Sequence, residues 1–432
     1  MKNFFEDVSL SFYPFSSADV ITASEIETPP DFLEPFSPDG TNVTKSALPR
    51  AARQRTGLLL LFAFLLFSAL FSLGFSALPA SAAETDYFST VSVELSENIS
   101  VRYTLAVPTG AEKLSVRFSF NGKEEIKTAD VSGKSEQVVC FDGITPQYLG
   151  RELKTTVSFD GGAPQEDTFS VKSYCETLLA ACPADYTAEE YAALRRLVCN
   201  LLLYGEAAQR YVGSPDPSCA AGLTEQERAD AFDLLPTSSC VSVTGEEEGL
   251  RFYSASLLLG SSVRIKIVFL CTRELTAPSL RLGGADGETD TEISGGEVWT
   301  QADGNEWYAY TAVSSPISLL RFSTPFEATV YEGEESLDKT LTYGVFSYVF
   351  SKAGERDEGG TPTPTANLAA ALYNYGYAAE VFRTTREIVS AVQKEVSAAS
   401  GGTFKLPQSL PLAGEIVRSA EENGLIDAAS GR

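Results

Sequence analysis

The chain has 432 residues, enough for two ordinary domains and their tails at about 150 residues per domain. Its formal charge of −25 argues against a nucleic-acid partner or an anionic membrane surface, because both require a basic patch. Histidine is absent, which excludes Ser-His-Asp and Cys-His catalysis and histidine-ligated metals. The seven cysteines contain no C-x-x-C pair, and we therefore expect no cofactor and no metal site.

The first 56 residues are expected to form a disordered, acidic tail. Residues 1–49 carry eight acidic side chains against Lys2 and Lys45, and several prolines interrupt any periodicity. Low hydrophobicity combined with one sign of charge prevents the burial that would repay chain ordering. Residues 1–56 are therefore not assigned to a folded domain.

Residues 57–83 are predicted to be a signal peptide or a transmembrane anchor. The uncharged run 57–75 would span about 28 Å as a helix, which matches a bilayer core. Basic residues precede it and acidic residues follow it, so the positive-inside rule places the chain after residue 84 outside the cytoplasm. The small residues Ala80-Ser81-Ala82 suit a signal peptidase. Cleavage and retention both stay open; in either case the bulk of the protein is exported.

A first module is expected over 84–213, beginning with β-strands. Apolar and polar residues alternate over 91–95, 99–105, 114–120 and 153–159, as they do in half-buried antiparallel strands. Asn121-Gly122 is a strong hairpin signal, and the strands recur at the spacing typical of a sandwich. The pattern predicts an all-β unit over 88–168.

Two helices are predicted to complete this module. A short one runs from Ser170 to Leu179, and a capping box at Thr187 and Glu190 begins a long one. One apolar stripe follows the long helix, and Gly205 lies beside it. Because Gly205 is small, we expect the helix to approach a neighbouring surface closely and to cover the sandwich as a lid.

A linker over 214–237, with a short helix capped at Thr224, leads to a second module over 238–383. Its strands are expected at 250–253, 263–270, 307–313, 319–322 and 326–331. Pro362 and Pro364 stand near the start of its long helix, where proline is tolerated. Residues 384–432 are expected to continue this helix to Gly401-Gly402 and to end in a disordered tail.

The two modules are related by an internal repeat. Leu201-Leu-Leu-Tyr-Gly-Glu-Ala-Ala-Gln-Arg-Tyr211 returns, 171 residues later, as Leu372-Tyr-Asn-Tyr-Gly-Tyr-Ala-Ala-Glu-Val-Phe382. The shared positions form the repeat signature: Tyr204, Gly205, Ala207, Ala208, Tyr211, Tyr375, Gly376, Ala378, Ala379 and Phe382. The predicted fold class is α+β, with two homologous modules, each an antiparallel β-sandwich followed by a helical hairpin, behind one N-terminal membrane segment. We assign the signature to packing, because its small residues allow close approach.

The signature resembles that of duplicated β-plus-helix modules in exported proteins of anaerobic Gram-positive bacteria. The first copy keeps it in full, including Gln209, whereas the second has Glu380 at that position. The resemblance covers roughly 88–383. It implies an exported, non-enzymatic surface protein and supplies no catalytic residues.

Two stretches could bind a ligand. The acidic loop 286–290 offers oxygen atoms to calcium but lacks EF-hand spacing, so a solvated turn is the preferred interpretation. Trp299, Trp307, Tyr308 and Tyr310 could stack on sugars. Strand alternation sends Trp307 to one face and the two tyrosines to the other, which favours core packing for one of these faces.

We therefore expect a non-catalytic cell-surface protein with a structural, adhesive or scaffolding role. Its expected partners are the cytoplasmic membrane through 57–75, at least during export, and a cell-wall or extracellular glycan or protein; nucleic acid is not among them. One alternative is a carbohydrate-binding surface protein that uses the Trp299 to Tyr310 region. Another is a hydrolase that uses paired carboxylates, whose separation would identify it.

Overall fold

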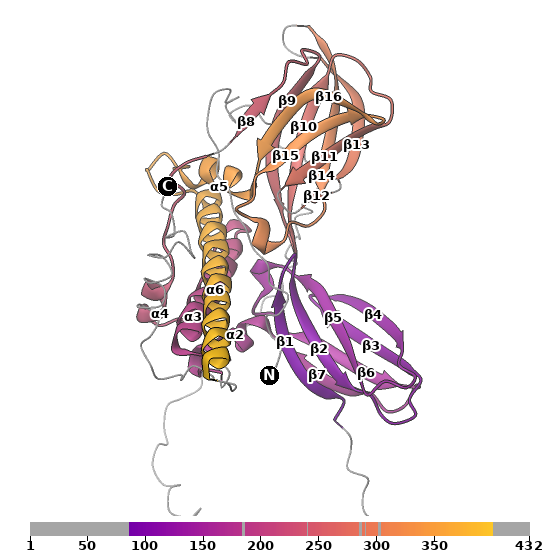
Figure 1. Ribbon diagram of the computed structural model, residues 1–432, viewed down its shortest axis with the longest axis vertical. Coiled ribbons are helices and arrows are strands. Elements are labelled where there is room, and N and C mark those ends of the chain that lie inside the picture. The colour runs from indigo at the N-terminus through magenta and orange to yellow at the C-terminus, as the bar shows by residue number, and fades with distance from the viewer. Residues whose placement is uncertain are drawn as a thin grey trace, which may run out of the picture. The chain divides into compact units, whose positions relative to one another are not determined.

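Seven strands form where the polar and apolar residues begin to alternate (Figure 1). In the computed structural model, which describes residues 86–183, 186–239, 241–284, 287–289, 291–300 and 304–400, they pair into two antiparallel sheets. The strands are β1 (Phe88–Leu95), β2 (Ile99–Ala106), β3 (Lys113–Phe120), β4 (Lys123–Asp130), β5 (Glu136–Ile144), β6 (Leu153–Phe159) and β7 (Gln165–Phe169). The sheet orders are β1-β2-β5 and β4-β3-β6-β7.

The two sheets face each other across an aromatic core, in a sandwich-like arrangement. Phe118 of β3 lies 5.3 Å from Phe141 of β5 and 6.1 Å from Tyr103 of β2, measured between ring centroids. Asn121 and Gly122 have φ values of 48° and 75° and turn β3 into β4, which confirms the predicted hairpin. The four strands predicted in this region are likewise confirmed.

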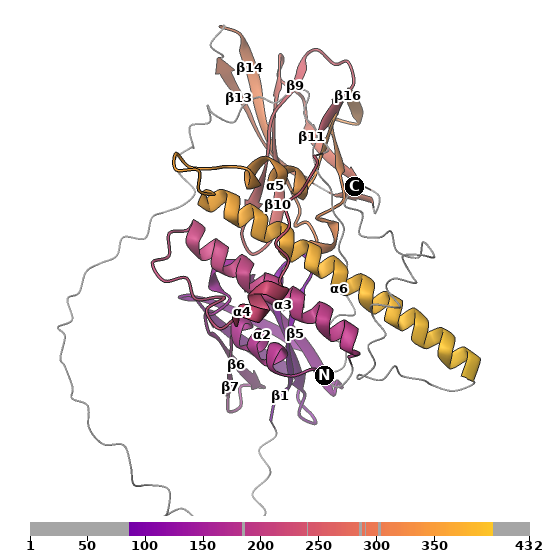
Figure 2. The ribbon, with the colours of Figure 1, turned by 90° about the vertical axis from the view of Figure 1, so that its left-hand side faces the viewer.

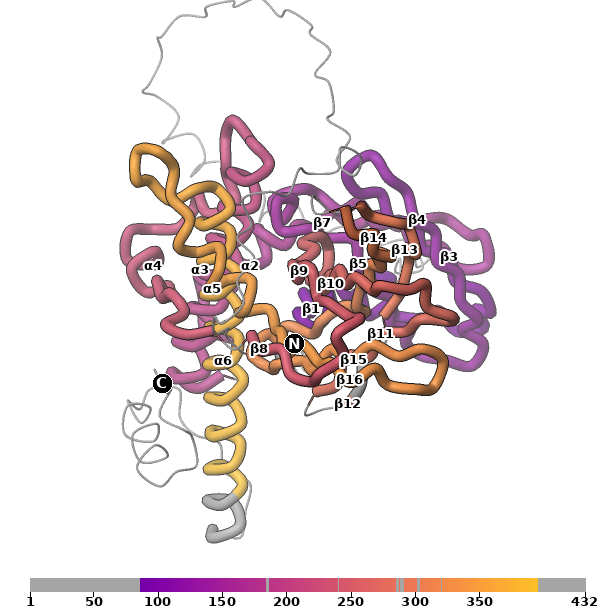
Figure 3. The backbone as a smooth tube through the Cα atoms, turned by 90° about the horizontal axis from the view of Figure 1, so that it is seen from above, coloured from indigo at the N-terminus to yellow at the C-terminus, as the bar shows by residue number. Residues whose placement is uncertain are grey.

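A second group of strands repeats this order with two additions. It comprises β8 (Ser242–Thr244), β9 (Leu250–Leu259), β10 (Val263–Cys271), β11 (Pro278–Gly284), β12 (Gly287–Thr289), β13 (Thr291–Thr300), β14 (Glu306–Ser314), β15 (Phe326–Glu332) and β16 (Glu335–Tyr343). Its sheets run β13-β14-β10-β9 and β12-β11-β15-β16-β8, all antiparallel. Figure 3 traces the chain through these strands. Relative to the first pair of sheets, β13 and β8 are extra edge strands.

Short 3₁₀ turns occupy equivalent places in the two groups. The first, η1 (Pro146–Tyr148), lies between β5 and β6, and the second, η2 (Leu319–Arg321), lies between β14 and β15. The strand predicted at 319–322 is therefore wrong. Its apolar residues are instead buried by the turn, with Leu319 and Phe322 each 3% exposed. A short apolar run does not by itself distinguish a strand from a buried helical turn.

The helices are α2 (Val171–Ala180), α3 (Ala188–Tyr211), α4 (Glu225–Asp230), α5 (Val345–Ala353) and α6 (Pro364–Ser400). The capping boxes predicted at Thr187 and Thr224 are present, and their Glu partners accept from the N-cap backbone. Pro364 opens α6, as expected of a proline in a first helical turn, and the hydroxyl of Thr363 accepts from the backbone N–H of Ala366.

The long helices do not form lids on separate sandwiches. Instead, α3 and α6 pack along each other in antiparallel directions, and α3 also contacts η1 (Figure 2). The expectation that α3 covers its own sheet is therefore wrong. An amphipathic stripe shows that one helix face is buried but does not identify the surface that buries it.

The segment between the two halves is packed rather than a plain linker. Cys219 and Ala220 are almost fully buried, and the guanidinium of Arg195 on α3 lies 3.3 Å from the carboxylate of Glu227 on α4. Within the part of the chain that the structure describes, no helix has both the length and the hydropathy needed to cross a bilayer. The predicted membrane segment 57–75 and the cleavage motif at 80–82 lie outside the described residues.

Candidate functional site

The repeat signature meets itself at the centre of the helix pair. Tyr204 of α3 and Tyr375 of α6, which occupy the same position in the two copies, stack with their ring centroids 5.6 Å apart and their planes 11° apart. Both rings are 3% exposed. Burial raises the pKa of both phenols, so both stay neutral over the physiological range. Tyr204 and Tyr375 are therefore packing residues.

The other signature residues differ in their exposure to solvent. Most are buried, whereas Tyr211, at the end of α3, is 48% exposed. The buried set comprises Gly205, Ala207, Ala208, Ala378, Ala379 and Phe382. Gly376 is also buried in α6. The assignment of the signature to packing agrees with these positions.

Gly205 permits a close approach of α3 to its neighbours. A Cβ placed on it would lie 2.7 Å from Cδ1 of Leu149 and 2.9 Å from the carbonyl oxygen of Pro146. These atoms belong to η1 and to the residue after it, so the close approach is to this turn and not to the face of a sheet. That partner differs from the sheet predicted from the sequence.

Gln209 fastens two chain segments to α3. Its side-chain oxygen accepts from the backbone N–H groups of Ser218 and Cys219 at 2.8 and 3.1 Å, and its nitrogen donates to the carbonyl of Gln147 at 3.1 Å. Glu380 occupies the matching position of α6, where it makes only a half-exposed ion pair with Arg383. The departure of the second copy from the signature thus has a structural counterpart.

We expect Gln209→Ala to lower the free energy of unfolding by about 1–2 kcal/mol, because backbone groups of Ser218 and Cys219 lose their acceptor. Glu380→Ala is the matched control, and it should change stability by less than about 0.5 kcal/mol, as is usual for a surface ion pair. Urea unfolding of both variants measures the difference. Equal effects at the two positions would contradict this account.

A second set of contacts joins the N-terminal end of α3 to the middle of α6. The ring of Tyr186, just before α3, stacks on Phe382 with 6.2 Å between centroids. The guanidinium of Arg386 lies over the same tyrosine ring and 3.4 Å from the carboxylate of Glu190. Glu190 also accepts from the backbone of Thr187, so a single buried carboxylate caps α3 and holds α6.

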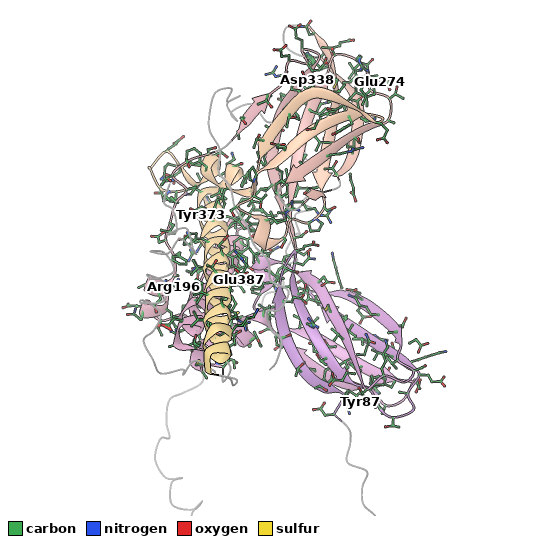
Figure 4. All side chains as sticks on the ribbon, viewed as in Figure 1. Tyr87, Arg196, Glu274, Asp338, Tyr373 and Glu387 are labelled. Carbon is green, nitrogen blue, oxygen red and sulfur yellow. The ribbon has the colours of Figure 1, made fainter. Side chains whose placement is uncertain are left out.

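Aromatic residues also link α6 to α5, the helix that follows the second pair of sheets, and to the segment 214–237. Tyr373, labelled on α6 in Figure 4, packs on Phe346 of α5 at 4.2 Å between centroids. Tyr377, one turn later, meets Phe232 edge to face, and the guanidinium of Arg196 covers Phe232 from α3. These aromatic side chains of α6 therefore make packing contacts with neighbouring elements.

The four aromatic residues predicted to bind a ligand separate between two faces of β13 and β14. Tyr310 is buried in the core, where it stacks on Phe269 and its hydroxyl accepts from the backbone of Leu275. Tyr308 packs against the same core. Trp307 lies on the opposite face, as the alternation predicts, and its cross-strand partner is Trp299. Of these four residues, Trp299 is 40% exposed and Trp307 is half-buried, and both lie outside the main core.

A third aromatic side chain on this outer face was not predicted. Tyr253 is the extra residue of a β-bulge in β9, and its ring meets Trp299 edge to face with 5.7 Å between centroids. A second bulge, at Gly295 and Gly296, lies in β13 just before Trp299. The sequence signal for that bulge is the Gly-Gly pair, whereas no glycine marks the one in β9. We call Tyr253, Trp299 and Trp307 the aromatic face.

The acidic loop yields no site among the described residues. Gly287–Thr289 forms β12, while Asp286 and Asp290 lie outside the described residues. Across the part of the chain that the structure describes, no three Cys, Asp or Glu residues gather in a way that could hold a metal ion.

No family model matches the chain, and no curated protein matches it significantly.

Proposed function

We propose that the protein is an exported, non-catalytic component of the cell surface with a structural, adhesive or scaffolding role. We further propose that it consists of two homologous modules, 84–213 and 238–383, each with two sheets and a helical hairpin. The observation that carries this proposal is the use of the repeat signature: its buried residues join the two halves through the packing of α3 on α6.

Three features support the duplication. Each sheet of the first half has a counterpart in the second with the same strand order, apart from the added β8 and β13. The turns η1 and η2 fall at the same point of that order. Finally, Tyr204 and Tyr375, equivalent in the repeat, touch each other, and equivalent residues meet where a two-fold axis relates two copies. The helix pair thus resembles the interface of a homodimer within one chain.

Three carboxyl groups in the described part of the chain have a pKa that their local partners shift. A general acid in a hydrolase needs a carboxyl group with a raised pKa. Where the pKa of a carboxyl departs from its ordinary value in the described part of the chain, the departure is downward. Arg273 holds the pKa of Glu332 at about 2, and the backbone of Thr224 lowers the pKa of Glu227. These groups are structural anions.

Cys182 offers a direct test of the exported location. Its thiol is in no disulfide and Cys182 is exposed after α2. Partial desolvation of the sulfur and the nearby carboxylate of Glu190 raise the pKa of the thiol, so labelling is best done at mildly alkaline pH. We expect a membrane-impermeant maleimide to label the full chain on intact cells of its own host, and Cys182→Ser to reduce that labelling. Labelling of Cys182 that appears only after cell lysis would refute export.

A further inference from the structure

The aromatic face spans one whole sheet. Tyr253 and Trp299 lie on β9 and β13, the two edges of the order β13-β14-β10-β9, so their strands are three spacings, about 14 Å, apart. Their rings nevertheless lie 5.7 Å apart between centroids, in an edge-to-face contact. The two side chains must therefore extend toward each other over β14 and β10.

Beneath them is an apolar floor that is separate from the main core. Leu270 and Val268 of β10 and Ala309 of β14 are at most 8% exposed, although they belong to the face that points away from the sandwich core. Leu270 is fully buried. Rings that cover such a floor are held by packing on one side, whereas Trp299 keeps 40% of its surface exposed on the other. The exposed indole is thus pre-positioned rather than loose.

The β-bulge in β13 requires glycine. Gly295 has φ +122°, and a Cβ there would lie within van der Waals overlap of the carbonyl oxygen of Ala309, so no other residue fits. A bulge bends its strand and redirects nearby side chains, and bulges are over-represented beside binding sites. In β13 this device lies three residues before Trp299.

Polar groups border the rings in two cross-strand rows. One row runs Ser294, Thr311, Val268 and Ser254, and the other runs Glu297, Ala309, Leu270 and Arg251. Cross-strand partners share a face of the sheet. Hydroxyls thus lie in one row, while a carboxylate and a guanidinium end the other. The two rows thus offer hydrogen-bond donors and acceptors, and the single carboxylate and the single guanidinium leave them without net charge.

We infer that the aromatic face binds a neutral polysaccharide, a chain of β-linked pyranoses with equatorial hydroxyls. Such a sugar presents C–H groups on its ring faces, which pack on indole by dispersion, and hydroxyls at its rim, which the bordering polar rows can bind. An anionic polymer is disfavoured by the protein's charge of −25. The extra strand β13 supplies Trp299. In the first half, the outward positions of β2 and β5 carry Arg102, Thr104, Val138 and Cys140.

Tryptophan fluorescence tests the inference directly, because Trp299 and Trp307 are the only tryptophans of the chain. Selective excitation of tryptophan in the full chain therefore reports on this face alone. We expect cellohexaose, chitohexaose or xylohexaose to shift or quench the emission in a saturable manner, and polygalacturonate to have no effect. We expect Trp299→Ala to weaken binding at least about tenfold, read through Trp307. Tyr253→Ala should weaken it less.

Phe350→Ala is the matched control, since Phe350 lies on α5 with a comparable exposure of 41%. It should leave the affinity unchanged. No response to any of the neutral oligosaccharides, a response to the polyanion alone, or full affinity in Trp299→Ala would each overturn the inference. A change in emission that depends on protein concentration without sugar would show a second copy on this face and would also overturn it. The inference rests on the proposed function in one respect: the protein meets a polysaccharide only if it is exported. Labelling of Cys182 tests export separately from sugar binding.

Discussion

Gly205→Leu is expected to lower the free energy of unfolding by at least about 3 kcal/mol. Leucine improves helix propensity by roughly 1 kcal/mol, but steric overlap with the neighbours of Gly205 outweighs this gain. The first carbon of the new side chain would already lie 2.9 Å from the carbonyl oxygen of Pro146 and 3.1 Å from Cβ of Cys219. Both neighbours are held in place, so the turn η1 or the helix α3 must move.

Hydrogen exchange read by peptide mass spectrometry locates this loss. Because α3 packs on α6, we expect protection to fall in both helices and not in the first half alone. Gly354→Leu is the control: Gly354 is exposed at the end of α5 and has open space around it. A Gly205→Leu protein with unchanged exchange throughout α3 would contradict the close approach.

The strands could be predicted from the sequence because one of their faces is exposed to solvent and the other is buried, so that polar and apolar residues alternate. Where a strand alternates cleanly, as over 99–105 and 114–120, the prediction is confirmed. The strands β4 and β13 are edge strands with many exposed residues, so no apolar period marks them. The run at 319–322 resembles a strand in sequence because it is apolar and short, although it is buried in a 3₁₀ turn.

The partner of each helix lies beyond the reach of local pattern. The stripe on α3 predicts a buried face, and Gly205 predicts a close neighbour, but both signals are compatible with a sheet, a turn or another helix. The deciding residues, Tyr186, Phe382 and Arg386, are far apart in sequence, and nothing in their local pattern relates them. Tertiary packing makes that choice.

The candidate site shows the same division. Alternation places Trp307 apart from Tyr308 and Tyr310, and the structure agrees. Tyr253 joins the tryptophans only because a bulge in β9 adds a residue there and β13 pairs with β14 at the far edge. The alternation of polar and apolar residues indicates neither the bulge in β9 nor the order of the strands in the sheet. The sequence therefore could not show that Tyr253 lies beside the tryptophans.

The stack of Tyr204 on Tyr375 is expected to couple the stability of one half to that of the other. Each ring is 3% exposed, and truncation to alanine leaves a large cavity, so we expect Tyr204→Ala and Tyr375→Ala each to cost about 3–4 kcal/mol. If the rings stabilise each other, the double variant should lose about 1 kcal/mol less than the sum of the two, the coupling typical of an aromatic pair.

A double-mutant cycle in urea measures this coupling. The control cycle pairs Tyr204→Ala with Phe269→Ala, a core residue of the second sheets that stacks on Tyr310, and it should be additive within about 0.5 kcal/mol. Additivity in the Tyr204 and Tyr375 cycle as well would mean that the two halves do not support each other through the signature. Coupling there, with additivity in the control, means that the repeat uses its shared tyrosine as the contact between copies, because each copy offers the other the same ring.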